Sequence, residues 1–238
     1  MAEPVDVSIV IPAYNEARRL PATLARWQEY FSRRPYAWEL LVVDDGSRDE
    51  TAAVAERGGA TIIRLDPNEG KGGAVRAGVL AARGARIAYV DADMNVAPEY
   101  LAEALRHIDA GADLVAGRRE LSEYAAAEGI LRLLAGALVQ VTRRALVMSA
   151  IRDTQCGFKV FRRELALAVF SRAQIRSFAF DIEVLFLARK LGAKIVEMPV
   201  TTTYHAESTF NVGKHLPLLL HDIVQIRLND LRGRYASS

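Results

Sequence analysis

Two aspartates one residue apart follow a short apolar run, and their spacing points to metal chemistry. Residues 87–93 read Ile-Ala-Tyr-Val-Asp91-Ala92-Asp93. If the run is a strand, its side chains alternate, so Asp91 and Asp93 project on the same side at its carboxyl end. Two converging carboxylates repel each other unless a cation lies between them. Oxygen ligands of this kind suit Mg²⁺ or Mn²⁺, which complete their coordination with water and substrate phosphates. The pattern predicts a metal–diphosphate site, and an acidic turn at a strand end is the alternative.

Two further polar clusters also follow apolar runs. Asp44-Asp45-Gly46-Ser47 offers carboxylates that could accept hydrogen bonds from a base or ribose, whereas the plainer interpretation is a turn in which Ser47 or Asp49 caps a helix. Residues 68–73, Asn-Glu-Gly-Lys-Gly-Gly, open a predicted helix whose backbone N–H groups and lysine favour a phosphate. A flexible turn is the alternative there, because neither GxxxxGK[ST] nor GxGxxG spacing is present.

The second half of the chain holds two more candidate segments. Residues 153–159 read Asp-Thr-Gln-Cys-Gly-Phe-Lys, and no paired histidine is evident for Cys156, which we therefore interpret as a small packed side chain. Phe180-Asp181-Ile182-Glu183 begins a predicted helix with two acids, a placement that the helix dipole already favours. The functional interpretation is that one of the two acids faces a pocket as a general base.

Alternating strands and helices position these clusters. Five strands are predicted in the first half, at residues 5–11 (closed by Pro12), 38–44, 60–65, 85–91 and 112–117, with helices between them. This alternation implies βαβ crossovers and a largely parallel sheet, whose ligands bind beyond the carboxyl ends of the strands. The predicted elements of the second half are one or two helices in 121–150, a strand and turn in 153–162, helices at 163–170 and from 180, a strand at 194–200 and an amphipathic helix at 214–232.

Composition limits the function classes. The chain has 238 residues, 51% of them hydrophobic and 25% charged, which suits one large α/β domain. A net charge of +2, without a basic run interleaved with aromatics, predicts no nucleic-acid partner. The single cysteine excludes an internal disulfide, and a cytoplasmic location is expected. The acidic start is unlike a signal peptide, and no apolar run approaches the ~18 residues that span a bilayer.

The order of the motifs carries a resemblance. The motifs are VSIVIPAYNE, LLVVDDGSRD, NEGKGGAVRAG, YVDADM, DTQCGFKVF and FDIEVLFLARKLG. They follow one another as in family-2 inverting glycosyltransferases, over about residues 5–210. DTQCGFK, the FD-x-E helix and an IR-x-x-x-L tail at 226–231 extend the resemblance to dolichyl-phosphate β-glucosyltransferases and other polyprenyl-phosphate sugar synthases. It implies an α/β GT-A fold, a Rossmann-like open sheet flanked by helices. A single domain over 1–238 would bind the nucleotide sugar with about 1–118 and the acceptor with about 119–238.

The resemblance also implies roles by position. The implied donor-binding residues are Pro12, Ala13, Tyr14, Glu16, Asp44, Asp45, Lys71, Gly72, Asp91, Ala92 and Asp93. The implied cofactor, Mg²⁺ or Mn²⁺, would bind Asp91, Asp93 and Asn95. The implied catalytic residues are Asp181, Gln155 and Arg118, and the implied acceptor or loop residues are Arg132, His205 and Ser208.

The implied reaction is an inverting displacement at the anomeric carbon of a sugar. A hexose would pass from a nucleotide-sugar donor, UDP-glucose or GDP-mannose, to a polyprenyl or dolichyl phosphate, while cations neutralise the departing nucleoside diphosphate. A hydroxyl acceptor would need Asp181 as a base. A lipid phosphate is already anionic, and arginines such as Arg118, Arg119 or Arg132 could hold it by bidentate contacts.

Several alternatives stay open at this point. A family-2 enzyme could instead act on a small-molecule or glycan hydroxyl. A nucleotidyltransferase would carry a Gly-rich, Arg-containing loop where this chain has residues 12–16, and an inactive sugar-nucleotide-binding module would not need Asp181. The amphipathic segments 121–150 and 214–232 could lie on a membrane surface, with Leu216, Leu218, Leu219 and Ile223 in the apolar face of the second, or could pack on the core. The oligomeric state is left open.

Overall fold

The computed structural model describes residues 4–120, 141–142, 151–202 and 212–236, side chains from 216 onward in the last range. Its elements are β1 (Val7–Ala13), α1 (Leu20–Ser32), β2 (Trp38–Asp44), α2 (Thr51–Arg57), β3 (Thr61–Arg64), α3 (Gly70–Ala81), β4 (Arg86–Val90), α4 (Tyr100–Asp109), β5 (Leu114–Arg119), β6 (Phe158–Arg162), α6 (Arg163–Phe170), α7 (Phe180–Lys190), β7 (Ile195–Val200) and α8 (Val212–Leu231).

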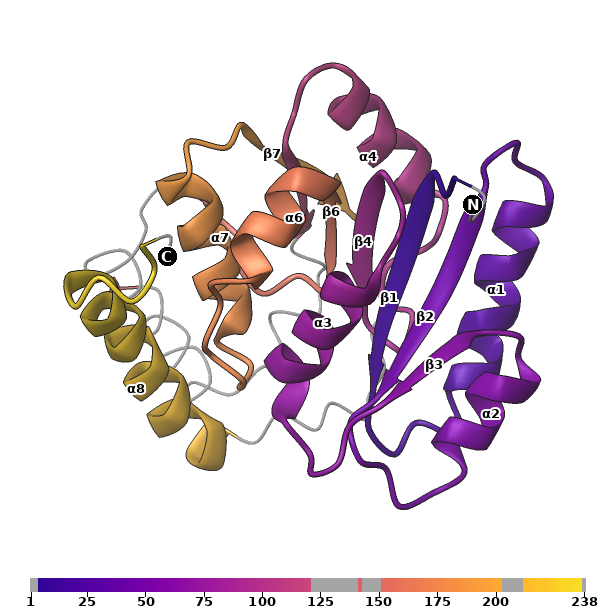
Figure 1. Ribbon diagram of the computed structural model, residues 1–238, viewed down its shortest axis with the longest axis horizontal. Coiled ribbons are helices and arrows are strands. Elements are labelled where there is room, and N and C mark those ends of the chain that lie inside the picture. Colours follow the sequence, from indigo (N-terminus) through magenta and orange to yellow (C-terminus); the bar gives the residue numbers. More distant parts are fainter. Residues whose placement is uncertain (1–3, 121–140, 143–150, 203–211, 237–238) are drawn as a thin grey trace.

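In the described part of the chain, seven strands form one sheet in the order β3-β2-β1-β4-β6-β5-β7 (Figure 1). The neighbours pair in parallel, except that β6 runs antiparallel to both β4 and β5. The predicted open and mostly parallel sheet is confirmed, and the five strands expected in the first half are all present.

The insertion of β6 between β4 and β5 was not predicted, and it matters for the site. Val90 at the end of β4 pairs with Phe158 at the start of β6, and Ala116 of β5 pairs with Lys159. Because the β4–β6 pair is antiparallel, the amino end of β6 lies beside the carboxyl end of β4. Residues 153–157 are thereby brought to the place where Asp91 leaves the sheet.

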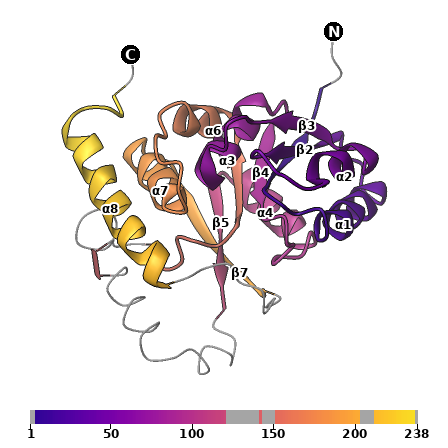
Figure 2. The same ribbon diagram turned by 90° about the horizontal axis from the view of Figure 1, so that it is seen from below.

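Helices cover both faces of the sheet (Figures 1 and 2). On one face, α1, α2 and α4 bury apolar side chains such as Trp27 and Leu105 against alternate residues of the strands. On the other face, α3, α6, α7 and α8 do the same with Val75, Phe170 and Ile223. The central strands are buried on both sides, as a parallel sheet requires.

Strand β1 continues past the proline that was expected to close it. Pro12 pairs with Val43 of β2, whereas pairing with β4 ends at Val10. Position 12 therefore has a neighbouring strand only on the β2 side. A proline is tolerated there because no strand on the β4 side needs a hydrogen bond from its missing N–H.

Helix α8 partly contradicts the apolar face predicted for residues 214–232. Leu219 and Ile223 are buried in the core, whereas Leu218, Val224 and Leu231 are exposed. No helix in the described ranges combines the length and the apolar character needed to cross a bilayer. The prediction for 121–150 lies outside the described residues, apart from a helical pair at 141–142.

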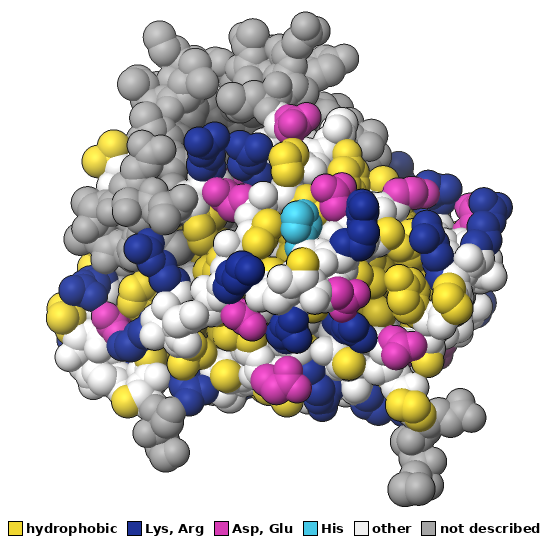
Figure 3. Space-filling view, turned by 90° about the horizontal axis from the view of Figure 1, so that it is seen from above, with side chains coloured by type: hydrophobic (Ala, Val, Ile, Leu, Met, Phe, Trp, Pro, Cys, Tyr) yellow, Lys and Arg dark blue, Asp and Glu magenta, His cyan; other side chains and the backbone are white. Residues whose placement is uncertain are grey.

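One face of the molecule carries acidic and basic side chains interspersed with apolar ones (Figure 3). Mixed charges of this kind keep the local electrostatic field weak.

Candidate active site

The two aspartates of the D-x-D motif lie in a turn directly after β4. The strand ends at Val90, and Met94 has a φ of 52°, so a turn rather than strand alternation places Asp93. Strand alternation, from which the prediction was argued, therefore does not extend to Asp93. The hydroxyl of Thr23 in α1 donates to the carbonyl of Ala92 over 2.6 Å and holds this turn against the neighbouring helix.

Asp93 is set up as a ligand for a cation. Its Oδ2 accepts a hydrogen bond of 2.7 Å from the side-chain amide of Asn95, whereas its Oδ1 is buried without a hydrogen-bond partner. Burial, and next the negative charge of Asp91, raise the pKa of Asp93. A buried carboxylate oxygen without a donor is costly unless a cation binds it. A divalent cation held by Asp91 and Asp93 fits these residues. No cluster of three or more acidic, histidine or cysteine ligands occurs in the described ranges, so phosphates and water would complete the shell.

Lys71, in the first turn of α3, faces the same carboxylates. Its Nζ lies 2.5 Å from Oδ1 of Asp91, and both side chains are about a fifth exposed, so a ligand can reach them. Burial alone would lower the pKa of Lys71, but Asp91, then Asp181 and Asp93, raise it. The ammonium group of Lys71 therefore lies near three carboxylates from two distant segments, and it forms an ion pair with one of them, Asp91.

Asp181, at the start of α7, is held through one oxygen. Its Oδ1 accepts from the hydroxyl of Tyr89 and from Nζ of Lys159, each over 2.5 Å. Lys159 is fully buried and also donates to the carbonyl of Cys156 over 2.8 Å. Burial, and next the Asp181 carboxylate, raise the pKa of Tyr89 well above its ordinary value, so its hydroxyl remains a donor.

Tyr89 and Lys159 were missed in the sequence, although a signal existed for the lysine. Lys159 stands among Phe158, Val160 and Phe161, and an unpaired lysine is hardly ever fully buried. A lysine inside an apolar strand therefore predicts a buried acidic partner. The identity of that partner required the fold.

Asp44 and Asp45 support the turns at the carboxyl end of β2. Oδ1 of Asp44 accepts from the backbone N–H of Ser47 over 3.0 Å, and Oδ1 of Asp45 accepts from that of Glu69 over 2.7 Å. Ser47 does not cap α2, whose N-cap is Glu50; the hydroxyl of Ser47 accepts from the N–H of Asn15, and the N–H of Thr51 in the first turn of α2 donates to Asp49. Both carboxylates thus stabilise turns, in agreement with the interpretation of residues 44–47 as a turn. Their contact with a base or ribose stays a prediction.

The loop after β1 joins this edge of the sheet. The backbone N–H of Asp45 donates to the carbonyl of Ala13 over 2.9 Å, which places Pro12 and Ala13 next to the β2 turn. Tyr14 is 47% exposed and can meet a ligand with its ring. Glu16 forms a bidentate pair with Arg19, with N–O distances of 2.6 and 2.7 Å.

Three backbone amides at the start of α3 form hydrogen bonds within the protein, and the phosphate contact expected of this turn stays a prediction. The N–H of Glu69 donates to Asp45, that of Gly70 to the side chain of Asn68, and that of Gly72 to the carbonyl of Arg176 over 2.8 Å. These three amides already have acceptors, and the side chain of Lys71 is the charged group that this turn offers an anion.

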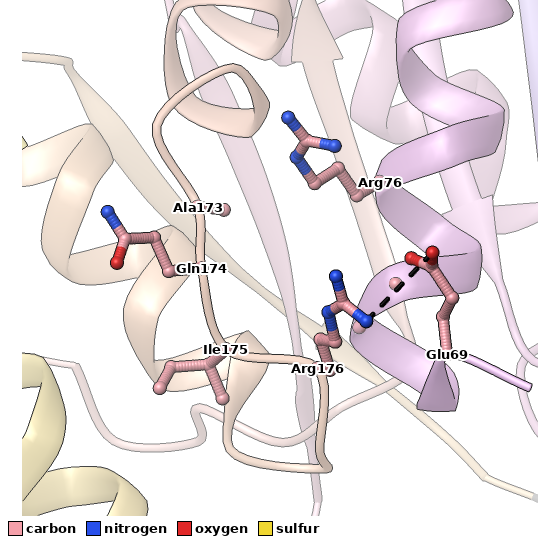
Figure 4. Close-up of a pocket in the computed structure, with 8 residues that line it drawn as sticks. Glu69, Arg76, Ala173, Gln174, Ile175 and Arg176 are labelled. Atoms are coloured by element: carbon pink, nitrogen blue, oxygen red, sulfur yellow. Dashed lines mark ion pairs between the residues drawn. The ribbon is translucent and has the colours of Figure 1, made fainter.

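A pocket beside this turn is separate from the aspartates (Figure 4). It holds about 290 Å³ between α3 and the loop at 173–176, and Arg176 lies 3.9 Å from Glu69 across it. Its lining residues are Glu69, Gly72, Gly73, Arg76, Ala173, Gln174, Ile175 and Arg176. The close packing of Gly72 on this loop, where a Cβ would lie 2.4 Å from the carbonyl oxygen of Ile175, explains the glycine without any ligand.

Comparison with known proteins decides the family. The family model for glycosyl transferase family 2 matches residues 8–170. The dolichyl-phosphate beta-glucosyltransferase of Dictyostelium discoideum is 34% identical over 254 residues, which cover 97% of this chain and 77% of that protein. The chain belongs to glycosyl transferase family 2. It is a glycosyltransferase, as the order of its motifs predicted.

Further relatives agree with this assignment. The human dolichyl-phosphate beta-glucosyltransferase is 34% identical over 217 residues, covering 83% of this chain and 67% of that protein. Among solved structures, glucosyl-3-phosphoglycerate synthase from Mycobacterium tuberculosis in complex with Mn²⁺ and uridine-diphosphate-glucose superposes with a TM-score of 0.72 at 19% identity, over 94% of this chain and 79% of that one. The same enzyme in complex with phosphoglyceric acid gives a TM-score of 0.74 at 19% identity, over 94% and 80%. This likeness confirms the predicted GT-A fold.

The two acids of the FD-x-E motif in this glycosyltransferase have different surroundings. Glu183 is fully buried away from Asp181, and it accepts hydrogen bonds from the backbone N–H groups of Gln174 and Ile175 and from the hydroxyl of Tyr235. Burial raises the pKa of Glu183. Glu183 therefore ties the loop beside α3 and the end of the chain to α7, and Asp181 is the acid that faces the carboxylate cluster.

The segment before β6 lies at the same edge. Asp153 pairs with Arg119 over 2.8 Å, and its Oδ1 accepts from the N–H of Gln155. Cys156 is buried and packed as predicted, and burial raises the pKa of its thiol to about 11. The Nε of Arg118 is buried without a hydrogen-bond partner. Direct contacts of Gln155 and Arg118 with substrate stay predictions.

Three predicted residues of this glycosyltransferase, Arg132, His205 and Ser208, lie outside the described residues.

Proposed function

We propose that this glycosyltransferase transfers glucose from UDP-glucose to a polyprenyl phosphate of the dolichyl type, with a divalent cation bound at Asp91 and Asp93. The observation that carries the proposal is the buried, unpartnered Oδ1 of Asp93 beside the Lys71–Asp91 ion pair. A cation bound there would satisfy that oxygen, and Lys71 would attract a diphosphate. The sugar and the acceptor follow from the names of the relatives, which are dolichyl-phosphate beta-glucosyltransferases.

The donor would lie across the carboxyl ends of β1, β2 and β4. When bound, the cation, Mg²⁺ or Mn²⁺, supplies positive charge for the diphosphate that leaves. Lys71 adds a mobile positive charge from the protein, since its ion pair with Asp91 can open toward an incoming phosphate. Tyr14 is exposed at this edge and would cover the base, as a ring can do at small entropic cost.

The acceptor would approach Asp181 from the side of α7. Tyr89 and Lys159 both bind Oδ1, which holds the carboxylate in one orientation. A phosphate acceptor is already a nucleophile, so no proton has to be removed before it attacks the anomeric carbon opposite the leaving group. The guanidinium of Arg118, whose Nε lacks a partner, would hold the acceptor phosphate.

Helix α8 would face a membrane that holds such an acceptor. Leu218, Val224 and Leu231 are 55%, 41% and 69% exposed on one helix that also carries Arg227 and is followed by Arg232. We expect salt-sensitive co-sedimentation with anionic liposomes, reduced by replacing Leu218 and Leu231 with glutamine. Absence from the pellet at low salt would contradict this part of the proposal.

Two experiments test the function in sequence. The first measures thermal stabilisation by UDP, GDP, dTDP and their glucose or mannose conjugates, each with and without Mn²⁺, because a ligand specific for the folded state raises its stability. The second follows radiolabelled sugar from the stabilising donor into dolichyl phosphate, with the phosphate-free alcohol dolichol and a panel of soluble hydroxyl compounds in parallel.

Each outcome separates the alternatives. Metal-dependent stabilisation by UDP, followed by labelled lipid phosphate and release of UDP, supports the proposal. Transfer to a hydroxyl compound instead would replace the acceptor but keep the donor. Release of inorganic diphosphate would identify a nucleotidyltransferase, and binding without turnover on any acceptor would identify an inactive module.

A further inference from the structure

Gly157, in the segment before β6, meets Asp91 at the end of β4. The antiparallel register pairs Val90 with Phe158, and continuing it by one residue places Asp91 opposite Gly157. Directly opposed residues project their side chains on the same face, with Cβ atoms about 4.5–5.5 Å apart. Position 157 therefore determines how much room the Asp91 carboxylate has.

The available room is taken entirely by that carboxylate. A Cβ added to Gly157 would lie 1.9 Å from Oδ2, 2.3 Å from Cγ and 2.7 Å from Oδ1 of Asp91. Each distance is far below van der Waals contact, and all three atoms belong to one side chain. The backbone gives no other reason for the glycine, because Gly157 lies outside the left-handed region that Gly46 and Gly70 occupy.

The segment that carries Gly157 is itself held in place. On its other side, a Cβ at Gly117 of β5 would lie 2.8 Å from Sγ of Cys156 and 3.1 Å from the carbonyl oxygen of Phe158. Cys156 thus packs into the space beside Gly117, and Asp91 packs into the space beside Gly157. The segment has no room to move away from Asp91 toward β5.

We propose that Gly157 is a positioning residue that sets the orientation of the Asp91 carboxylate toward Lys71 and the bound cation. The part that concerns the cation rests on the proposed function. In this orientation Oδ2 lies against Gly157, and Oδ1 contacts Nζ of Lys71 at 2.5 Å. A methyl group at 157 forces the carboxylate to rotate, because an aspartate side chain can turn about its own bonds whereas the paired strands cannot separate. The change therefore falls on the site more than on the fold.

The test uses the full chain with Gly157→Ala, and with Gly58→Ala as a matched control. At Gly58 an added Cβ would also strike the end of a side chain, Cδ1 of the buried Leu24 at 2.5 Å, but between α2 and α1. Crystal structures without ligand should show the Lys71–Asp91 ion pair broken in Gly157→Ala and intact in the control. A carboxylate that keeps its place in Gly157→Ala overturns the proposal, whatever the enzyme transfers.

Binding provides a second readout that a structural role alone would not move. We expect Mn²⁺, titrated by electron paramagnetic resonance in the presence of UDP, to bind roughly 10–100-fold more weakly to Gly157→Ala and unchanged to the control, the range found when the surroundings of a ligand are altered. In an Asp91→Ala background, adding Gly157→Ala should change the affinity less than about 2-fold, since coupled changes are not additive. Full additivity contradicts the proposal.

Two outcomes distinguish this inference from the proposed function. If the wild type binds no Mn²⁺ with UDP, the proposed function fails, and the crystal structures still decide the positioning of Asp91. If Gly157→Ala does not fold, the double variant with Asp91→Ala should fold, because the obstructing atoms are gone. Failure of the double variant to fold would show that the clash lies elsewhere and would overturn the inference.

Discussion

Replacing Lys159 with methionine isolates the contribution of the buried ion pair beneath the site. Methionine has nearly the shape of lysine, so the change removes the ammonium group with little loss of packing. It leaves the carboxylate of Asp181 buried with the hydroxyl of Tyr89 as its remaining donor, and it leaves the carbonyl of Cys156 without one.

The expected cost follows from burial. The side chains of Lys159 and Asp181 are 0% and 4% exposed, and their N–O distance is 2.5 Å. Breaking a buried pair by removing one partner typically costs about 3–5 kcal/mol, because an uncompensated charge stays inside. Since a domain is stable by about 5–15 kcal/mol, we expect Lys159→Met to lose a large part of the free energy of unfolding.

Urea denaturation followed by circular dichroism measures this loss, with two comparisons. Lys190→Met removes a pair in which the lysine is 44% exposed and Asp230 keeps Arg227 as a second partner, so it should cost about 1 kcal/mol or less. Lys159→Met combined with Asp181→Asn removes both charges and should be more stable than Lys159→Met alone by at least about 1 kcal/mol.

Two results would refute the reasoning. If Lys159→Met costs no more than Lys190→Met, the buried pair does not contribute as its burial implies. If the double variant is as unstable as the sum of the single changes, the two charges do not act on each other.

Three further predictions concern single side chains. Asp93→Ala should abolish the Mn²⁺ dependence of UDP binding measured by calorimetry, and an unaltered dependence would exclude the aspartate as a ligand. With a pKa of about 11, the buried Cys156 is roughly one part in a thousand thiolate at pH 8, so a disulfide reagent should modify it slowly until denaturant is added, and fast labelling of the native chain would contradict its packing. Burial would raise the pKa of Asp153, but the hydrogen bonds from Arg119 lower it, so its contribution to stability is present above the unfolded value near 3.9 and is lost as the pH falls through the lower folded value. Asp153→Asn should therefore cost about 1–2 kcal/mol at pH 7, less than a fully buried pair because Arg119 is half exposed, and the difference should shrink in acid, with equal loss at both pH values counting against the ion pair.

Local patterns were sufficient for the strands and for the polar ends of β2 and β4. A buried strand shows as an apolar run, and the residue that ends it shows as a change to polar residues, so both can be read within about ten positions. Asp91 and Asp93 were found in this way, although a turn and not strand alternation places Asp93.

Contacts between distant segments could not be predicted from those local patterns. The strand at 158–162 could be read as a strand, but its position between β4 and β5 could not, because pairing depends on which neighbours compete for its edges. That position decides that Gly157 meets Asp91. The amide of Gly72 in α3 likewise donates to the carbonyl of Arg176, a contact that depends on how α3 packs against the loop before α7.

By itself, the sequence determined the class of sheet, the edge at which the polar residues gather and the family of the enzyme, because each depends on short runs of residue types and their order. The choice between Asp181 and Glu183 was made by the tertiary structure. Two positions apart on a helix, their side chains point about 200° from each other, so one must face the site and the other must face away. The local sequence does not distinguish the two acids. The packing of α7 against β4, β6 and α8 brings Asp181 into contact with Lys159 and Glu183 into contact with Tyr235.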